Sequence, residues 1–570
     1  MNDWLSGLLP DNEHTRHYLK EFPAMAEEYR RTPIAVLPFS LFRLFHDTGS
    51  RVEYEDAYFD HRKRLNVFLL LTLSGKWEYL PDLEDILAAV CEEYTWVLPA
   101  HQREDADPAE SIGRIDLFSS ETAFALSETL HLIGDRLHPT LRRRMRHELR
   151  RRIVEPYLLY HREWGANNWS AVCAAGVLAT FIYLGLDDEF EAARGPLTGS
   201  LDKFLGSFAE DGCCTEGPLY WQYGFGFFCY GAALLRDYTH GEIDYFKDPK
   251  VHAIATYGAG CHMTENFVLP FADTPHRWCF DMGLDHFLRR QYPELPGFDP
   301  TWENIFGDEA RYRTPEILRN LYWYDEKLTA DAVLLPRVDF PVSRQYVRNR
   351  AGYSFGCKGG HNDEPHNHND LGAFFVLKDG QFLLDDPGSC EYDKYYFKKD
   401  HRYRDYLCAM SQGHCVPILN GAGQMYGREF SAETVSCEDD CVVLDLSRAY
   451  DIPGLRFVRT FRLEERAVEI TDEIAGADTV TERFVTRILP EQSADGFTIA
   501  DARLIGENCR PELNSEQFIS PLRDADRTAL SREPFSTRKL FNGGMSLEET
   551  LYLMDFRCPG SGTYRFRLEW

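Results

Sequence analysis

The chain has 570 residues, of which 44% are hydrophobic and 27% are charged, a composition typical of soluble globular proteins. This length is too great for one hydrophobic core and indicates roughly two or three domains. The formal net charge of −29 argues against nucleic acid and anionic membranes as partners, because both need a basic face on the protein.

The N-terminal sequence MNDWLSGLLPDNEH lacks the basic segment and the long apolar core of a signal peptide. Fifteen cysteines are scattered without a repeated CxxC spacing, so we expect reduced thiols and a cytoplasmic location. The longest uncharged run, residues 169–186, just reaches transmembrane length, but it contains Ser and Thr and directly follows Asn167 and Asn168. We expect a fully buried inner helix there and no contact with a membrane.

Up to about residue 330 the hydrophobic residues have a helical period. Residues 81–94 (PDLEDILAAVCEEY) carry them at 83, 86, 87, 90, 91 and 94, which is one face of a helix with Pro81 in its first turn. Similar stripes occur at 122–134, 169–184 and 225–236. Many helices in series with inner and outer faces predict a solenoid or an α/α toroid over residues 1–335.

After residues 331–333 the hydrophobic period changes to two. Segments of this kind are 345–355, 441–446, 456–474 and 563–570, separated by turns rich in Gly, Asp and Pro. Short alternating strands predict a large antiparallel β-sandwich over residues 336–570. The predicted fold class is therefore α+β and multidomain, with the helical domain first.

Residues 366–390, HNHNDLGAFFVLKDGQFLLDDPGSC, place histidines before one apolar strand and carboxylates after a second one. A Lys-Asp-Gly turn at 378–380 separates the strands and predicts a β-hairpin. On one strand His366 and His368 would point to the same face, and Asp385 or Asp386 would return beside them. Two imidazoles with a carboxylate suit a metal site or a proton-transfer site. The alternative is a polar hairpin edge with incidental histidines.

Two polar motifs lie in the helical half. In residues 164–170, WGANNWS, Asn167 and Asn168 directly precede the buried helix. In residues 211–224, DGCCTEGPLYWQYG, a turn rich in Gly and Pro carries Glu216, Tyr220, Trp221 and Tyr223. Helix capping by Asn and core packing by Tyr and Trp would explain either motif alone.

Taken together, these motifs resemble those of the heparinase II/III-like polysaccharide lyases. The similarity runs from about residues 96–101 through the β half, and its specific parts are NNW at 167–169, DGxxxEGPxYWxYG at 211–224, HNHND at 366–370, DPG at 386–388 and SQGH at 411–414. The resemblance implies an α/α toroid, an incomplete barrel, followed by an antiparallel β-sandwich. It also implies β-elimination at a uronic acid, in which a base removes the C5 proton, an acid protonates the leaving O4 and the carboxylate is neutralised.

The resemblance assigns roles to individual residues. By position, Asn168 resembles the group that neutralises the carboxylate, with Asn167 as its neighbour. Tyr223 resembles the catalytic tyrosine that transfers a proton at O4, and His366 resembles the base that acts from the opposite face. Weaker candidates for substrate binding are Asn167, His101, Trp169, Glu216, Tyr220, Trp221, His276, Arg277 and Tyr396.

A zinc site, structural or near the active site, is also implied by the resemblance. His368, Asp386 and His414 resemble the zinc ligands of family members, and two imidazoles with one carboxylate match the ligand preferences of zinc. Asp385 is an alternative to Asp386. Many relatives have His-Asn-Thr at the last position, whereas this chain continues from His414 to Cys415 and Val416, so Cys415 is a further candidate.

The function expected from these motifs is a carbon–oxygen lyase that acts on anionic uronate oligosaccharides or polysaccharides, with glycosaminoglycans favoured. An alginate or oligoalginate lyase and a non-catalytic carbohydrate-binding relative are the alternatives. A glycoside hydrolase would need two opposed carboxylates, whereas Glu216 is the only well-placed carboxylate in the helical motif. The sequence is compatible with a homo-oligomer.

Overall fold

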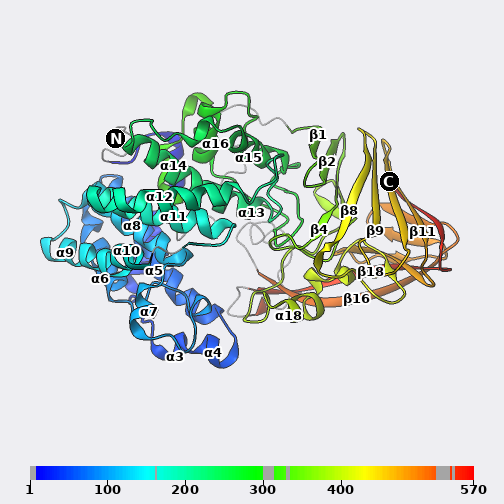
Figure 1. Cartoon of the computed structure of the whole chain (residues 1–570), viewed down its shortest axis with the longest axis horizontal. Helices are drawn as coiled ribbons and strands as arrows, with labels where there is room; N and C mark the ends of the chain where they lie inside the picture. Colours follow the sequence, from blue (N-terminus) through cyan, green and yellow to red (C-terminus); the bar gives the residue numbers. More distant parts are fainter. Residues whose placement is uncertain (1–7, 161–162, 299–312, 329–333, 522–539, 542–545) are drawn as a thin grey trace. The chain divides into compact units, whose positions relative to one another are not determined.

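The structure, a computed structural model, describes residues 8–160, 163–298, 313–328, 334–521, 540–541 and 546–570 (Figure 1). The chain forms two compact units. The first comprises Met1–Ser207, Tyr220–Ala255 and Cys279–Ala332, and the second comprises Phe208–Leu219, Thr256–Trp278 and Val333–Trp570. Two segments from within the helical half therefore belong to the second unit, and the predicted domain boundary at residue 335 stays a prediction.

The first unit, called the helical unit below, is built from α-helices. Their bounds are α1 (Glu13–Tyr18), α2 (Phe22–Arg31), α3 (Phe39–Phe42), α4 (Leu44–Thr48), α5 (Val52–Leu73), α6 (Leu80–Glu92), α7 (Pro108–Gly113), α8 (Leu117–Ile133), α9 (Pro139–Leu149), α10 (Glu155–Tyr160), α11 (Asn168–Leu184), α12 (Asp187–Leu205), α14 (Gly226–Tyr238), α16 (Met282–Gln291) and α17 (Thr314–Tyr322). Helices α13 (Pro218–Tyr220) and α15 (Pro249–Gly260) cross the limits between the units. The π-helical turn η5 (Trp221–Phe225) joins α13 to α14.

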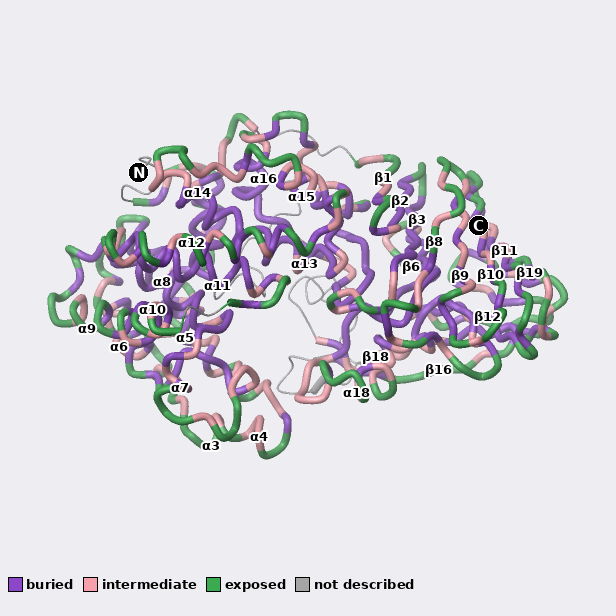
Figure 2. Tube along the Cα trace, in the orientation of Figure 1, coloured by how far each residue is buried: buried purple, intermediate pink, exposed green. Residues whose placement is uncertain are grey.

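Helix α11 of this unit is buried along nearly its whole length (Figure 2). In α11 every residue except Trp169 is buried, as expected for a helix surrounded by protein. Gly176 lets α11 approach α8 closely, because a Cβ there would lie 2.4 Å from the carbonyl oxygen of Ser120. The predicted inner helix is therefore confirmed. Across the described ranges no helix is both long and apolar enough to cross a membrane.

The second unit, called the β unit, carries the strands and the short helix α18 (Lys399–Asp405). The strands are β1 (Arg337–Phe340), β2 (Gln345–Arg350), β3 (Tyr353–Lys358), β4 (Gly360–Asn362), β5 (Phe374–Lys378), β6 (Gln381–Leu384), β7 (Ile418–Leu419), β8 (Gly427–Cys437), β9 (Cys441–Arg448), β10 (Arg456–Leu463), β11 (Ala467–Ala475), β12 (Val480–Thr486), β13 (Glu491–Gln492), β14 (Gly496–Ile499), β15 (Ala502–Gly506), β16 (Arg510–Pro521), β17 (Leu540–Phe541), β18 (Ser546–Cys558) and β19 (Gly562–Glu569). The predicted segments 345–355 and 456–474 are each two strands joined by a turn, the first at Gly352 with φ 94°.

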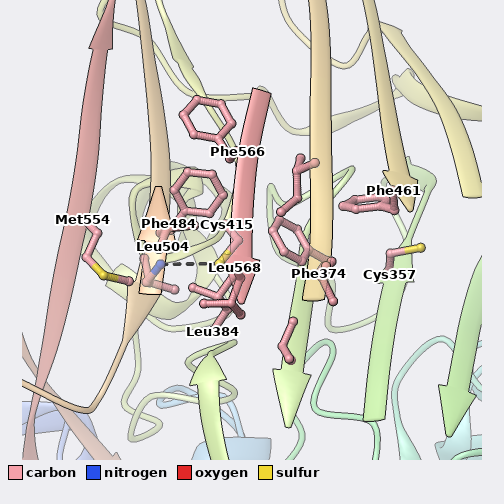
Figure 3. Packing of buried hydrophobic residues seen from close by; sticks show 14 of the residues in the cluster. Cys357, Phe374, Leu384, Cys415, Phe461, Phe484, Leu504, Met554, Phe566 and Leu568 are labelled. Carbon is pink, nitrogen blue, oxygen red and sulfur yellow. Dashed lines mark hydrogen bonds between the residues drawn. The ribbon is translucent and has the colours of Figure 1, made fainter. Parts of the chain in front are cut away.

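Among the described residues these strands form three antiparallel sheets. Their orders are β1-β2-β3-β5-β6, β13-β14-β15-β19-β11-β10-β9-β8-β4, and β16-β18-β12-β7 with β17 also on β18. Alternate side chains meet in one core, in which the rings of Phe374 and Phe461 are 4.9 Å apart and those of Phe484 and Phe566 are 5.0 Å apart (Figure 3). The predicted fold class, a helical first half and an antiparallel β second half, is confirmed.

Candidate functional site

The helical unit places Asn168 against the turn that carries Tyr223. Asn167 is the N-cap of α11, and its side chain accepts a hydrogen bond from the Trp169 backbone N–H at 3.1 Å, so capping accounts for this residue. Asn168 is the first helical residue and is buried. A Cβ at Gly224 would lie 3.1 Å from the Asn168 Cβ, which is tighter than ordinary van der Waals contact, so glycine favours this approach. Because Tyr223 directly precedes Gly224, the two predicted residues are neighbours in the fold.

Tyr223 contacts a carboxylate and a cation. Its hydroxyl donates a hydrogen bond to Glu121 Oε1 on α8. The Arg313 guanidinium lies 4.2 Å from the centroid of the Tyr223 ring, with its Nε 3.7 Å from Glu121 Oε1. Burial raises the pKa of Glu121 to about 7, although the Arg313 charge and the Tyr223 hydrogen bond lower it. Glu121 therefore changes charge near neutral pH while in hydrogen-bond contact with Tyr223, which suits proton exchange.

The other predicted residues of this unit differ in exposure. His101 donates from Nδ1 to Asp116 Oδ2 at 2.7 Å, and its ring lies 4.8 Å from that of Trp169. Both rings are half-buried, as is Tyr220, so a ligand can reach them. Trp221 has no exposed surface and its indole N–H donates to the Ile254 carbonyl at 2.8 Å. Full burial in the core does not fit the predicted contact of Trp221 with a sugar.

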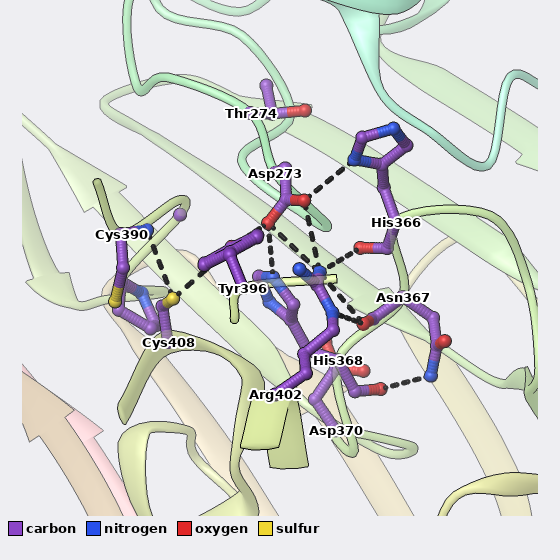
Figure 4. A network of polar contacts seen from close by, with 12 residues as sticks. Asp273, Thr274, His366, Asn367, His368, Asp370, Cys390, Tyr396, Arg402 and Cys408 are labelled. Atoms are coloured by element: carbon purple, nitrogen blue, oxygen red, sulfur yellow. Dashed lines mark hydrogen bonds and ion pairs between the residues drawn. The ribbon is translucent and has the colours of Figure 1, made fainter. Parts of the chain in front are cut away.

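In the β unit, one buried carboxylate joins the two predicted histidines (Figure 4). Asp273 accepts from His366 Nδ1 at 2.7 Å through Oδ2 and from His368 Nε2 at 3.0 Å through Oδ1. The Tyr396 hydroxyl also donates to it, and Arg402 Nη2 lies 3.0 Å from its Oδ2. Burial alone would raise the pKa of Asp273, but the Arg402 charge and the two imidazole hydrogen bonds hold it well below its ordinary value.

The two histidines do not share a strand face, so that prediction is wrong. Residues 363–373 form turns and loop, and the hairpin strands are β5 and β6 only. His366 has a left-handed backbone, with φ 56°, which breaks the alternation that the prediction assumed. Asp273, 93 and 95 positions away in the sequence, brings the two imidazoles together instead.

His368, Asp386 and His414 lie together and are buried, with potential ligand atoms all within 4.8 Å of one another. His414 Nε2 donates to the Cys408 carbonyl at 2.7 Å, while its Nδ1 lies 3.0 Å from Asp386 Oδ2. His368 Nε2 is held by Asp273, and no hydrogen-bond partner for its Nδ1 is found among the described residues. Each imidazole thus has its Nε2 held by an acceptor, which leaves Nδ1 as the nitrogen that could bind a metal. This donor set fits zinc.

Asp385 and Cys415 lie outside this group. Asp385 accepts from His276 Nε2 at 2.7 Å and pairs with Arg487, which together hold its pKa at about 2 against the effect of burial. Cys415 is buried in the core and contacts the Asp385 carbonyl at 3.6 Å. His276 is therefore part of a half-buried ion-pair network around Asp385, and Asp386 is the carboxylate turned toward the histidines.

Three further candidates lie in the same unit. Glu216 has Oε2 3.8 Å from His366 Nε2, and burial raises its pKa. Arg277 is half-buried, donates to Asn266 Oδ1 at 2.7 Å and covers the Phe267 ring at 3.8 Å. Tyr396 is fully buried with its hydroxyl on Asp273, which does not fit the predicted contact with substrate. Glu216 is thus the candidate of this set that lies near His366.

Four charged residues of these sites were not predicted from the sequence: Glu121, Arg313, Asp273 and Arg402. Each is a single charged residue without a local motif, and its contacts join distant segments. Asp273 lies in the same short segment, DTPHRW, as the candidates His276 and Arg277. That proximity was the one available signal for it.

Comparison with solved structures identifies the fold. A heparan sulfate lyase HepC mutant from Pedobacter heparinus superposes with a TM-score of 0.59 at 14% identity, covering 98% of this chain and 83% of that one. A heparinase III gives 0.58 at 12% identity, covering 99% and 92%. A Streptomyces coelicolor A3 chondroitin AC lyase, solved in complex with chondroitin sulphate, gives 0.54 at 11% identity, covering 99% and 81%.

At these identities the likeness establishes the fold, and the expected resemblance to polysaccharide lyases is confirmed at that level. No family model matches the chain. No curated protein matches it either.

Proposed function

We propose that the chain is a polysaccharide lyase that cleaves uronate-containing oligosaccharides or polysaccharides by β-elimination, with glycosaminoglycans favoured over alginate. The observation that carries the proposal is the contact of Tyr223 with Glu121, next to Asn168, in a fold shared with lyases of this kind. A tyrosine hydroxyl on an ionisable carboxylate suits proton transfer at O4. The buried amide of Asn168 suits a hydrogen bond to the substrate carboxylate as charge develops there.

His366 is proposed as the second proton-transfer group. Asp273 accepts from its Nδ1, which fixes the tautomer that keeps Nε2 as the proton acceptor. This assignment follows the same logic as the Asp–His pairs of other acid–base sites, in which a buried carboxylate orients the imidazole.

A screen of defined uronate oligosaccharides tests the proposal. β-Elimination leaves an unsaturated uronate, whose ultraviolet absorbance should grow with time for at least one substrate. Binding without any rise in absorbance would indicate a non-catalytic carbohydrate-binding protein, and new reducing ends without absorbance would indicate a hydrolase.

Replacing Asn168 by Ala should lower the turnover of the best substrate by about 10²–10³-fold, as is typical when one donor to a developing oxyanion is removed. Rate and melting temperature should be measured on one preparation. Asn167→Ala is the matched control, since it removes the cap and should lower the unfolding free energy by about 1 kcal/mol while the folded enzyme keeps its rate. Equal rate losses in both variants would contradict the role of Asn168.

We also propose that His368, Asp386 and His414 bind one zinc ion, which would join three segments of the β unit and so stabilise it. His368→Ala should yield protein without zinc and with a lower melting temperature. His366→Ala, two positions away, should keep its zinc and lose activity. Elemental analysis and thermal unfolding of both variants provide the test. Full zinc in His368→Ala, or metal-free wild type after purification without chelators, would refute the site.

A further inference from the structure

Cys509 and Cys558 face each other across two strands of the β unit. Cys509 directly precedes β16 and Cys558 ends β18, and the register pairs Arg510 with Arg557. Opposed residues of antiparallel strands have Cα atoms about 4.5–5.5 Å apart, within the range that a disulfide spans. The two sulfur atoms are 2.7 Å apart, so the side chains already point toward each other.

The two thiols differ in access and acidity. Cys509 is half-buried, whereas Cys558 is buried. The hydrogen bond between the two thiols lowers the pKa of Cys509 and raises that of Cys558. Cys509 is therefore the thiol that loses its proton first and can be reached by a small oxidant, while Cys558 stands next to it.

The pair sits at the start of a weakly packed strand. β16 is the edge strand of the β16-β18-β12-β7 sheet, and of its twelve residues only Pro511, Phe518 and Ser520 are buried. Its far end is held by Ser520, which donates to Glu549 Oε2 at 2.6 Å. An edge strand with little buried surface opens easily, so a covalent bond at its first residues would hold it in register.

We propose that Cys509 and Cys558 are a site of covalent modification, forming a reversible disulfide that fastens β16 to β18. The oxidant is a low-molecular-weight disulfide, for which oxidised glutathione serves as the probe. The Cys509 thiolate attacks one of its sulfurs, forming a mixed disulfide and releasing one glutathione thiolate. The Cys558 thiol then loses its proton and attacks the Cys509 sulfur, which releases the second glutathione. Two protein thiols and one glutathione disulfide thus give one protein disulfide and two glutathione thiols.

This pair would be the exception to the reduced thiols expected from the sequence. The bond would close the chain between positions 509 and 558, which restricts the unfolded state more than the folded one. The inference does not depend on the proposed lyase function, because it concerns only the sheet.

The test uses the full-length protein, either reduced or incubated with oxidised glutathione and then freed of it. After denaturation and alkylation, the reduced protein should carry one label on each of its fifteen cysteines, and the oxidised protein should carry two fewer. Peptide mapping should identify a cross-linked peptide joining Cys509 to Cys558, and dithiothreitol should restore both labels. Hydrogen exchange of the β16 amides should slow in the oxidised form.

Cys509→Ser is the direct variant, and Cys441→Ser, another half-buried cysteine of the β unit, is its matched control. The first should abolish the loss of two labels, and the second should leave it unchanged. A cross-link between other cysteines, or a glutathione adduct that stays on Cys509 without being resolved, would overturn the proposal. So would fifteen labels after oxidation. The peptide map of the wild type decides the matter even if a variant fails to fold.

Discussion

Tyr223→Phe should reduce turnover of the best uronate substrate by about 10²–10⁴-fold, the usual effect of removing a general acid or base. The substitution deletes one hydroxyl and keeps the ring, so the edge contact with Phe227 at 5.5 Å and the Arg313 guanidinium over the ring are retained. The melting temperature should therefore stay close to that of the wild type. Initial rates at saturating substrate, with thermal unfolding of the same sample, provide the measurement.

Tyr220→Phe is the matched control, since Tyr220 lies three residues earlier in the same motif and is half-buried. It should keep most of the wild-type turnover. A wild-type rate in Tyr223→Phe together with a collapse in Tyr220→Phe would transfer the role to Tyr220.

Glu121 gives this site a pH dependence. Its pKa of about 7 means that the carboxylate which accepts the Tyr223 proton is present above that pH. The rate should therefore rise as pH increases through about 7, and Glu121→Gln should lose this inflection. The effect of Glu121 on stability has the opposite sign, because its pKa in the folded protein lies above the ordinary value of 4.5. Below pH 4.5 the carboxyl is protonated in both the folded and the unfolded state, so it does not lower the unfolding free energy. Above about pH 7 it is charged in both states, and burial of that charge lowers the unfolding free energy to its full extent.

The fold was predictable because its signals are local and repeated. The 81–94 stripe is α6, and the uncharged run after Asn168 is α11. The change to a period of two after residue 333 coincides with the first strand, β1. These patterns show which face of a helix or strand is buried, because hydrophobic residues recur along the sequence at the positions that face the core.

The candidate site was predictable only in part, because its contacts are not local. The grouping of His368, Asp386 and His414 came from a resemblance, and the structure brings these residues together. Glu121 and Tyr223 are 102 positions apart, and no sequence motif contains both residues. His366 does not lie on a hairpin strand because its backbone is left-handed, and a period of two in the sequence does not reveal a left-handed residue. The role of an isolated charged residue can be inferred only when the fold shows which residues it contacts.

Asp273→Asn should produce the largest combined loss in the β unit. The carboxylate is fully buried and meets Arg402, two imidazole N–H groups and the Tyr396 hydroxyl. The asparagine amide has the same shape as the carboxylate but carries no charge. One of its oxygen acceptors is replaced by an NH₂ donor, which would face an imidazole N–H or the Arg402 guanidinium, both of which are also donors. Breaking one side of a buried ion pair costs about 3–5 kcal/mol of unfolding free energy. Denaturant unfolding should show a loss of that order.

A loss of stability alone would not show that Asp273 orients the two histidines, so a matched control is needed. Asp555 is also buried and is held by Arg483 in a two-point ion pair, at 2.7 and 2.8 Å. Asp555→Asn should be destabilising too, yet its folded fraction should keep both zinc and turnover. Asp273→Asn should lose zinc as well, because His368 Nε2 is no longer held by a carboxylate and its Nδ1 is no longer fixed as a ligand. If folded Asp273→Asn retains full zinc and the wild-type rate, then Asp273 serves the fold and not the histidines.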